Sequence, residues 1–267
     1  FAMECFENGL LATEDTNGIE LRFGNTEAML KCIDLIVKRE GIGDLLAEGT
    51  VRAAEKLGGG AMEFSMQVKG LDIPMHDPRV KAALGLGYMV NPHGADHCSS
   101  IHDTGFTTPG PQLDQVKSLG ILEPLPADDL SPRKVSLFRY IQQERIIRDC
   151  LLVCSFVPYS IEQVSDILAA VTGWKTGIVE MLTVSERTLT MARLFNVREG
   201  LTAVDDKLPA RFFQPKTSGI LSSTNYNAAE LEKAKSYYYT LMGWDTKSGI
   251  PTPEKLEELG IEGVAKV

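Results

Sequence analysis

The chain has 267 residues, of which 43% are hydrophobic and 24% charged, and its formal net charge is -9. This is the composition of a globular protein, so disorder and collagen-like repeats are excluded. A chain of this length buries roughly 70–75% of the surface that its unfolded form exposes, so it needs neither disulfides nor a structural metal to hold a core. The acidic balance argues against a nucleic-acid partner, whose phosphates attract clustered Lys and Arg.

Several features concern the compartment of the protein. No apolar run approaches the ~18 residues of a membrane span. The first residues include Glu4 and Glu7 and lack the basic start of a signal peptide. The five cysteines are an odd number without a C-x2-C pair, which argues against a secreted disulfide framework. We therefore expect a cytoplasmic protein with no membrane partner. Because Phe1 reads as part of a helix, we also expect a chain truncated at its N-terminus.

The first part of the chain reads as helical. Gly9 is placed to end a first helix, and Asn25 is placed to cap a second one that runs through about Lys38. The apolar stripe of this second helix is expected to contain Met29, Cys32, Ile33 and Ile36. A third helix is expected over residues 44–57, before a run of three glycines. Residues 64–68 alternate between apolar and polar and give the one good strand signal of the chain.

The rest of the chain reads as helices joined by loops, without regular alternation of strand and helix, so we expect an all-α fold. Short helices are expected over 80–88 and 113–119, the second within an irregular stretch from Gly105 to Pro132. The longer helices are expected over 133–148, from Ser160 onward, and over 176–195, 228–242 and 253–259. Their inward faces are expected to carry Val135, Phe138, Ile141, Ile146, Val164, Ile167, Leu168, Val171, Leu231, Ala234, Tyr238 and Leu241.

Three of the four histidines fall within residues 93–102 (HGADHCSSIH), the densest group of potential ligands or proton carriers in the chain. A histidine in this segment has three interpretations. It is a structural residue, an active-site proton carrier because imidazole titrates near neutral pH, or a zinc ligand together with Cys98. The turn-forming Gly94 leaves the geometry of such a zinc site undetermined.

A second segment, residues 149–156 (DCLLVCSF), places a carboxylate before two thiols that are about one helical turn apart. A thiolate at a helix end suits an iron–sulfur cluster, but such a site needs further ligands. The alternative is the end of a helix with buried cysteines, which is also the interpretation of Cys5 and Cys32. These residues alone do not name a reaction.

The longer motifs of the sequence resemble the tungsten-dependent aldehyde ferredoxin oxidoreductase family. In chain order they are AME (2–4), GLL (9–11), EDT (14–16), LRFGN (21–25), REGIGDLLAEG (39–49), VKG (68–70), Pro74, DPR (77–79), GADH (94–97), Asp149 with CSF (154–156), RLFNVREG (193–200), DDKLP (205–209), GWD (243–245) and GIP (249–251). They cover essentially the whole chain. The family has an N-terminal β domain that cradles a bis-pterin tungsten cofactor, followed by two mostly helical domains. The resemblance implies that residues 1–66 are the end of the second domain and residues 67–267 the third.

Three residues match functional motifs of the family. By this resemblance, Asp149 hydrogen-bonds the pterin, and Cys154 is the fourth ligand of a [4Fe–4S] cluster whose other three cysteines lie in the missing N-terminal β domain. Leu152 stands where the family commonly has Gly. His97 matches the active-site histidine near the tungsten, which donates to the substrate oxygen or takes up its proton. Cys150 is then a bystander.

The resemblance implies an enzyme that oxidises aldehydes to carboxylic acids, with water as the oxygen source and ferredoxin as the electron acceptor. Its expected cofactors are a tungsten (or molybdenum) bis-pterin and the [4Fe–4S] cluster. The resemblance is compatible with a homodimer but does not decide the oligomeric state. The alternatives on the same scaffold are an aromatic acyl-CoA reductase and an oxidoreductase for phosphorylated aldehydes. A non-enzyme alternative is an isolated helical module. We expect this chain alone to be inactive, because one cluster ligand and half of a pterin cradle do not retain either cofactor. A zinc-binding regulator is a further alternative.

Overall fold

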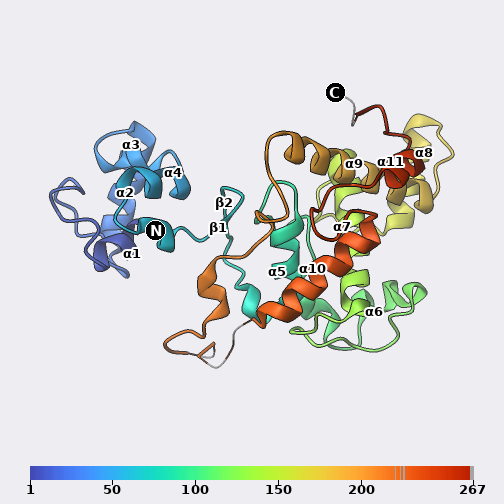
Figure 1. The fold of residues 1–267 in the computed structure, drawn as a ribbon, viewed down its shortest axis with the longest axis horizontal. Helices are drawn as coiled ribbons and strands as arrows, with labels where there is room; N and C mark the ends of the chain where they lie inside the picture. The colour runs from blue at the N-terminus through green and yellow to red at the C-terminus, as the bar shows by residue number, and fades with distance from the viewer. Residues whose placement is uncertain (220, 223, 225, 265–267) are drawn as a thin grey trace. The chain divides into compact units, whose positions relative to one another are not determined.

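The structure is a computed structural model, and it describes residues 1–219, 221–222, 224 and 226–264. The regular secondary structure of the described residues is helical apart from one two-stranded hairpin and an isolated bridge, so the predicted all-α fold is confirmed (Figure 1). The chain divides into two compact units, residues 1–73 and residues 74–267. In neither described unit is a helix both apolar and long enough to cross a bilayer.

The N-terminal unit consists of short elements in sequence. They are α1 (Ala2–Glu7), α2 (Thr26–Lys38), α3 (Ile42–Leu46), α4 (Thr50–Leu57), the 3-10 turn η1 (Ala61–Phe64), β1 (Gln67–Val68) and β2 (Leu71–Asp72). α2 begins where it was predicted, because the side chain of Asn25 accepts a hydrogen bond from the amide of Ala28 at 3.1 Å. The single helix predicted over 44–57 is wrong. Gly49, with a φ of 87°, separates α3 from α4.

The buried face of α2 differs from the predicted stripe. Cys32 is buried, but Met29 and Ile33 are exposed in the structure. The buried residues of α2 are Ala28 and Cys32. α3 also packs closely on α2. A Cβ atom on Gly43 would lie 2.1 Å from the backbone carbon of Leu35, so only glycine permits this approach. Ala28 and Cys32 themselves pack with Leu21 and with Phe6 of α1, and such tertiary contacts are not encoded in helical periodicity.

The strand predicted over 64–68 is largely wrong. Phe64 belongs to η1, and only Gln67 and Val68 are in a strand, which pairs antiparallel with Leu71–Asp72. Lys69 and Gly70 form the two-residue turn between the strands, with φ values of 52° and 84°. Two successive positive φ angles give the turn twist that a tight hairpin requires.

The C-terminal unit is built around one long helix. Its elements are η2 (Pro78–Val80), α5 (Ala82–Val90), η3 (Asp103–Phe106), α6 (Pro111–Gln115), η4 (Lys117–Leu119), α7 (Pro132–Cys150), α8 (Ile161–Thr172), α9 (Ile178–Arg198), η5 (Ala210–Phe213), α10 (Ala228–Met242) and α11 (Pro253–Leu259). α7 packs against α5, α9 and α10 (Figure 1). The predicted inward residues Val135, Phe138, Ile141 and Ile146 of α7 are all buried. The elements that carry the candidate site therefore share α7 as their support.

The other predicted helices of this unit are confirmed in type, and differ in detail. A capping box formed by Ser160 and Gln163 starts α8, but Ile167 and Val171 are exposed, because the helix packs on α9 through its first turns around Val164. The helix predicted over 113–119 is instead α6 followed by the 3-10 turn η4. On α10, the predicted residues Leu231, Ala234 and Tyr238 are buried, and Leu241 is half-buried.

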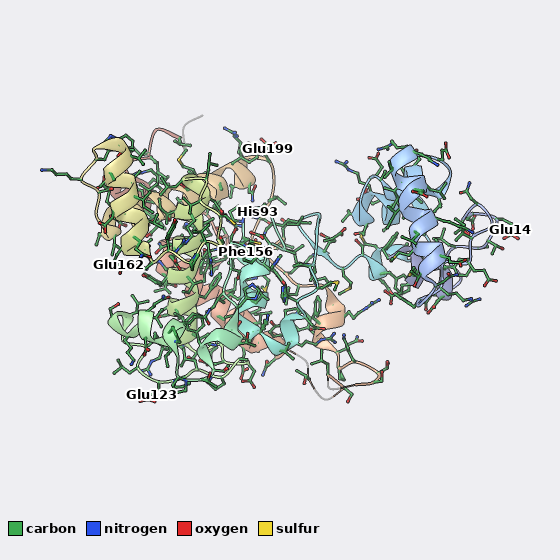
Figure 2. The ribbon with its side chains drawn as sticks, turned by 180° about the vertical axis from the view of Figure 1, so that it is seen from behind. Glu14, His93, Glu123, Phe156, Glu162 and Glu199 are labelled. Atoms are coloured by element: carbon green, nitrogen blue, oxygen red, sulfur yellow. The ribbon has the colours of Figure 1, made fainter. Side chains whose placement is uncertain are left out.

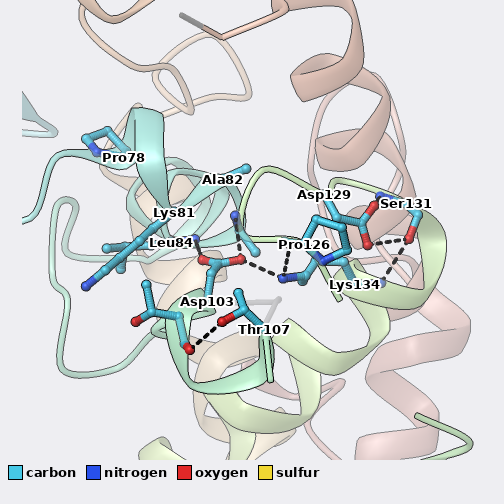
Figure 3. A network of polar contacts seen from close by, with 12 residues as sticks. Pro78, Lys81, Ala82, Leu84, Asp103, Thr107, Pro126, Asp129, Ser131 and Lys134 are labelled. Atoms are coloured by element: carbon cyan, nitrogen blue, oxygen red, sulfur yellow. Dashed lines mark hydrogen bonds and ion pairs between the residues drawn. The ribbon is translucent and has the colours of Figure 1, made fainter. Parts of the chain in front are cut away.

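A buried ion pair joins three segments of the C-terminal unit (Figure 3). The Lys134 ammonium, on the first turn of α7, lies 3.0 Å from a carboxylate oxygen of Asp103, and both side chains have 0% exposure. The same carboxylate accepts the amides of Ala83 and Leu84 in the first turn of α5. Lys134 also donates to the carbonyl of Pro126 at 2.8 Å.

These contacts replace a missing helix cap. The first amides of a helix have no intrahelical acceptor, and Lys81 at the N-cap of α5 supplies none from its side chain. Asp103 accepts the second and third of these amides, and the carbonyl of Ala127 accepts the first, from Ala82, at 2.8 Å. The stretch from Gly105 to Pro132 is thus fastened to α5 and α7.

We expect Lys134→Met to lower the free energy of unfolding by about 3–5 kcal/mol, because it leaves a buried carboxylate without its cation. Burial already raises the pKa of Asp103 in the folded protein. The deficit should therefore be smallest at acid pH and should grow as the pH rises through that folded-state pKa. Urea unfolding of the whole chain at several pH values measures it. The control is Lys117→Met, whose ammonium is paired with Asp114 but 52% exposed, and which should change stability by less than about 1 kcal/mol. Equal effects of the two variants would contradict the role of the buried pair.

The C-terminal end of α7 carries a leucine in a glycine conformation. Leu152 has a φ of 58°, and its amide donates to the carbonyl of Asp149, while the amide of Val153 donates to the carbonyl of Arg148 at 2.8 Å. This pair of bonds is the Schellman motif, in which the left-handed residue is usually Gly. Leu152 therefore forms, despite its side chain, a turn that usually has Gly at this position.

Leu152→Gly should raise the free energy of unfolding by about 1 kcal/mol, since glycine adopts a positive φ without the clash of a Cβ atom. The side chain that is lost is 93% exposed, so little packing is lost with it. Val153→Gly is the matched control, because Val153 is not at a positive φ and glycine should destabilise the chain there by about 0.5–1 kcal/mol. Thermal unfolding of both variants tests the assignment, and a Leu152→Gly protein less stable than the parent would refute it.

Candidate functional site

Three imidazole rings from separate turns of the chain form one cluster in the C-terminal unit. The ring centroid of His76 lies 4.9 Å from that of His97 and 4.9 Å from that of His102, and the last two are 5.9 Å apart. All three residues are half-buried. His76 precedes η2, whereas His97 and His102 come from the loop between α5 and η3. Of the three histidines within residues 93–102, His97 and His102 belong to this cluster and His93 does not, and His76 is the third member.

Lys81 joins this cluster as a fixed positive charge. Its Nζ atom lies 3.3 Å from Nδ1 of His76 and 3.1 Å from Nδ1 of His102. Burial, followed by the charge of Lys81, lowers the pKa of His102 to about 4, and the same two causes lower the pKa of His76. Both rings are therefore neutral at neutral pH.

His93 is exposed and faces Asp96. Its Nε2 atom lies 3.1 Å from a carboxylate oxygen of Asp96. Burial by itself would raise the pKa of Asp96, but hydrogen bonds from His93, from the Ser99 hydroxyl and amide and from the Cys98 amide hold it well below its usual range. Asp96 therefore acts as a permanent anion that organises the loop around His97.

One group of donor atoms in the described residues meets the spacing expected of a metal site. Asp96, His97 and Cys98 each offer a ligand atom, and these atoms lie within 4.8 Å of one another. The Sγ atom of Cys98 is 3.7 Å from Nε2 of His97. Since Asp96 already accepts bonds from three residues, its oxygens are poorly available to a metal. The zinc alternative for this segment, with His97 and Cys98, stays a prediction.

The second predicted segment begins on the last turn of α7. Asp149, Cys150 and Cys154 are exposed, and the three described thiols of the C-terminal unit are all free. The expectation of buried cysteines holds for Cys5 and Cys32 but is wrong for this segment. Cys150 lies 3.5 Å from the Thr188 hydroxyl on α9. A hydrogen bond joins the 149–156 loop to α7, because Arg145 of that helix donates to the carbonyl of Ser155 at 3.5 Å.

The fold brings the two predicted segments together. Desolvation, followed by the nearby Asp96 carboxylate, raises the pKa of Asp149, while His93 and Arg145 oppose the shift. The thiol of Cys98 also has a raised pKa, through desolvation and then through Asp96 and Asp149. Charge effects of this kind indicate that the 93–102 loop and the 149–156 loop lie within electrostatic range of each other. Figure 2 marks His93 and Phe156, one from each loop.

Sequence reasoning missed three members of this site. His76, Lys81 and Arg145 are separated from the predicted motifs in the sequence, and no spacing rule connects them to it. A weak signal existed for His76, which directly precedes the DPR motif at residues 77–79. Their placement depends on how η2, α5 and α7 pack, which only the structure shows.

The assembled site combines groups with distinct capacities. The histidine cluster contributes three imidazoles and one ammonium, and the 149–156 loop contributes a carboxylate and a free thiol, Asp149 and Cys154. Imidazoles can hold or move protons near neutral pH, and a thiolate is a ligand for a soft metal or an iron–sulfur cluster. The arrangement suits proton transfer beside a redox cofactor.

Comparisons with known proteins agree with this chemistry. The family model described as "Aldehyde ferredoxin oxidoreductase, domains 2 & 3" matches residues 1–261. A tungsten-containing aldehyde ferredoxin oxidoreductase of Pyrococcus horikoshii is 35% identical over 98% of the chain, and that of Pyrococcus furiosus is 35% identical over 97%. An aliphatic sulfonate oxidoreductase, WOR-like subunit, of Pyrococcus furiosus is 30% identical over the full chain.

A solved structure has the same fold. The active site complex BamBC of benzoyl coenzyme A reductase, in complex with 1,5-dienoyl-CoA, superposes with a TM-score of 0.71 and 26% identity, over 99% of this chain and 43% of that chain. The chain spans about 41% of the length of the Pyrococcus aldehyde ferredoxin oxidoreductases. Matched along nearly all of its length, it belongs to the aldehyde ferredoxin oxidoreductase family and corresponds to domains 2 and 3.

Proposed function

We propose that the chain is the C-terminal part of a tungstopterin iron–sulfur oxidoreductase that oxidises aldehydes to carboxylic acids. The observation that carries this proposal is the 35% identity, over 98% of the chain, to a tungsten-containing aldehyde ferredoxin oxidoreductase. It is supported by the charge effects of Asp149 and Cys154 on Cys98, which stands next to His97. Ferredoxin as electron acceptor, a homodimer and a cytoplasmic location belong to the same proposal and rest on the family resemblance. Within it, residues 1–66 are the end of the second domain and residues 67–267 the third.

The residues of the second loop fit one side of such a cofactor site. Cys154 is an exposed free thiol, and Leu152 and Phe156 on either side of it are each 93% exposed. Exposed apolar side chains around a soft ligand suit a surface that another part of the protein covers. In our proposal an N-terminal β domain covers it and supplies the remaining cluster cysteines. Since one thiol does not hold a [4Fe–4S] cluster, we expect this chain alone to bind no cluster and to be inactive.

Each proposed residue has one task. When bound, the tungsten (or molybdenum) bis-pterin and the [4Fe–4S] cluster supply the redox chemistry. Asp149 accepts a hydrogen bond from the pterin, and Cys154 ligates the cluster. His97 donates to the substrate oxygen or takes up the proton that the oxidation releases. Asp96 keeps the loop that carries His97 in place through its bonds to Cys98 and Ser99.

A second candidate function is reduction of an aromatic acyl-CoA thioester. It is favoured by the fold shared with the benzoyl coenzyme A reductase complex, at a TM-score of 0.71. An oxidoreductase for phosphorylated aldehydes is a further alternative. Assays of the full-length protein with simple aldehydes, phosphorylated aldehydes and aromatic acyl-CoA thioesters would separate the three, and turnover of the thioester alone would overturn our first choice.

In the full-length enzyme, His97→Ala should reduce aldehyde turnover at least about 100-fold, the usual contribution of a positioned proton carrier. Tungsten content should stay that of the parent, which shows that the cofactor site is intact. His93→Ala is the comparison, because His93 is exposed and outside the ring cluster but contacts Asp96 of the same loop, and it should lose much less turnover than His97→Ala. Near-normal turnover of His97→Ala would remove this residue from the mechanism.

Cys154→Ala in the full-length enzyme should abolish the electron paramagnetic resonance signal of the reduced cluster, since the cluster loses its fourth thiolate. The matched control is Cys150→Ala, which removes a neighbouring exposed thiol. Among the described residues, the polar contact of this thiol is with the Thr188 hydroxyl. Its signal should be that of the parent. If the signal survives in Cys154→Ala and is lost in Cys150→Ala, the two thiols have been assigned the wrong way round.

A further inference from the structure

The contacts of Lys81 determine the protonation of two rings in the histidine cluster. An ammonium group has only N–H donors, so a nitrogen that it contacts must be an acceptor. Lys81 reaches Nδ1 of both His76 and His102, at 3.3 Å and 3.1 Å. Each ring must then be neutral and must carry its proton on Nε2, because a proton on Nδ1 would point at the ammonium.

The carboxylates next to His76 and His102 do not favour protonation of these two rings. Asp77, the chain neighbour of His76, is paired with Arg79 at 2.7 Å, and Lys216 lies 3.4 Å from it. Asp103, the chain neighbour of His102, is paired with Lys134. Each acidic side chain thus already has its own cation.

The strongest charge effects on the two rings are all positive. On His76 they come from Lys81 and from His97 when that ring is protonated. On His102 they come from Lys81, then from the other two rings when protonated, and from Arg145 on α7. Each of these groups therefore disfavours a positive charge on His76 or His102.

His97 differs from the other two rings. The structure records no contact between its ring nitrogens and Lys81 in the described part of the chain, although its centroid is 4.9 Å from that of His76. Its recorded polar contact is with the Cys98 sulfur, a weak partner, at 3.7 Å. Lys81 thus contacts two of the three rings, and the third ring, His97, lacks this cation contact in the described part of the chain.

We infer that Lys81 is a positioning residue that fixes His76 and His102 as neutral, Nε2-protonated imidazoles, so that His97 is the ring of the cluster that exchanges a proton during the reaction. The first half of this inference concerns the chain itself. The second half rests on the proposed function, in which His97 moves the substrate's proton.

Side-chain 15N chemical shifts test the first half directly, because they separate protonated from unprotonated ring nitrogens and the chain has only four histidines to assign. In the parent chain, Nδ1 of His76 and His102 should be unprotonated at neutral pH. In Lys81→Met the pKa of His102 should rise by about one unit from its value of about 4, with burial still opposing its charge. Lys81→Arg, which keeps the cation, should largely restore the parent value.

Two results would overturn this half. One is a proton on Nδ1 of His76 or His102 in the parent chain, which needs no variant and so does not depend on Lys81→Met folding. The other is an unchanged titration of both rings in a folded Lys81→Met protein. Lys117→Met, which removes an exposed lysine paired with Asp114, is the control and should leave all four histidines as in the parent.

The catalytic half is tested by the pH dependence of aldehyde turnover in the full-length enzyme. Lys81→Met should add an inflection at acid to neutral pH that the parent and Lys81→Arg lack, since two further rings then titrate there. An identical pH profile, together with the expected 15N shifts, would disprove the catalytic half alone. A parent enzyme that oxidises no aldehyde would instead refute the proposed function, with the 15N result still standing.

Discussion

A carboxylate and an ammonium that are both removed from water meet between η3 and α7, and the candidate site depends on this pair. Asp103 and Lys134 lie 3.0 Å apart without exposure. A buried ion pair is costly to form, but losing one partner is costlier still, so the pair fixes the segments that bring its members together. Asp103 also accepts two first-turn amides of α5, and Lys134 holds the carbonyl of Pro126.

Through α7, the ion pair connects the histidine cluster to the loop at residues 149–156. His102 directly precedes Asp103 in the chain. Lys81 directly precedes α5, whose first-turn amides bind Asp103. The hydrogen bonds of Asp103 therefore hold Lys81 and His102 close to each other. Lys134 stands at the start of α7, and Asp149 stands at its end. A rigid helix of 19 residues therefore connects the anchor of the histidine cluster to the loop that carries Cys154.

Local signals in the sequence predicted the parts of the fold that depend on neighbours in the chain. Asn25 and Ser160 cap helices because their side chains reach amides three residues away, and such rules are readable from sequence. The same rules failed where packing decides. The exposure of Ile33 depends on tertiary packing, and the separation of α3 from α4 depends on the positive φ of Gly49, and periodicity encodes neither. The same distinction applies to the candidate site. The sequence indicated the 93–102 and 149–156 loops as candidates, whereas only the structure shows that Lys81 contacts the histidines.

Amide hydrogen exchange in α5 tests the central role of the buried pair most directly. Ala83 and Leu84 occupy the first turn, where amides are normally unprotected, and here their acceptor is Asp103. In the parent chain both should exchange as slowly as amides in the middle of α5, and in Lys134→Met both should lose this protection together, with α9 little changed. Fast exchange of Ala83 and Leu84 in the parent, or equal protection in Lys134→Met, would contradict the account.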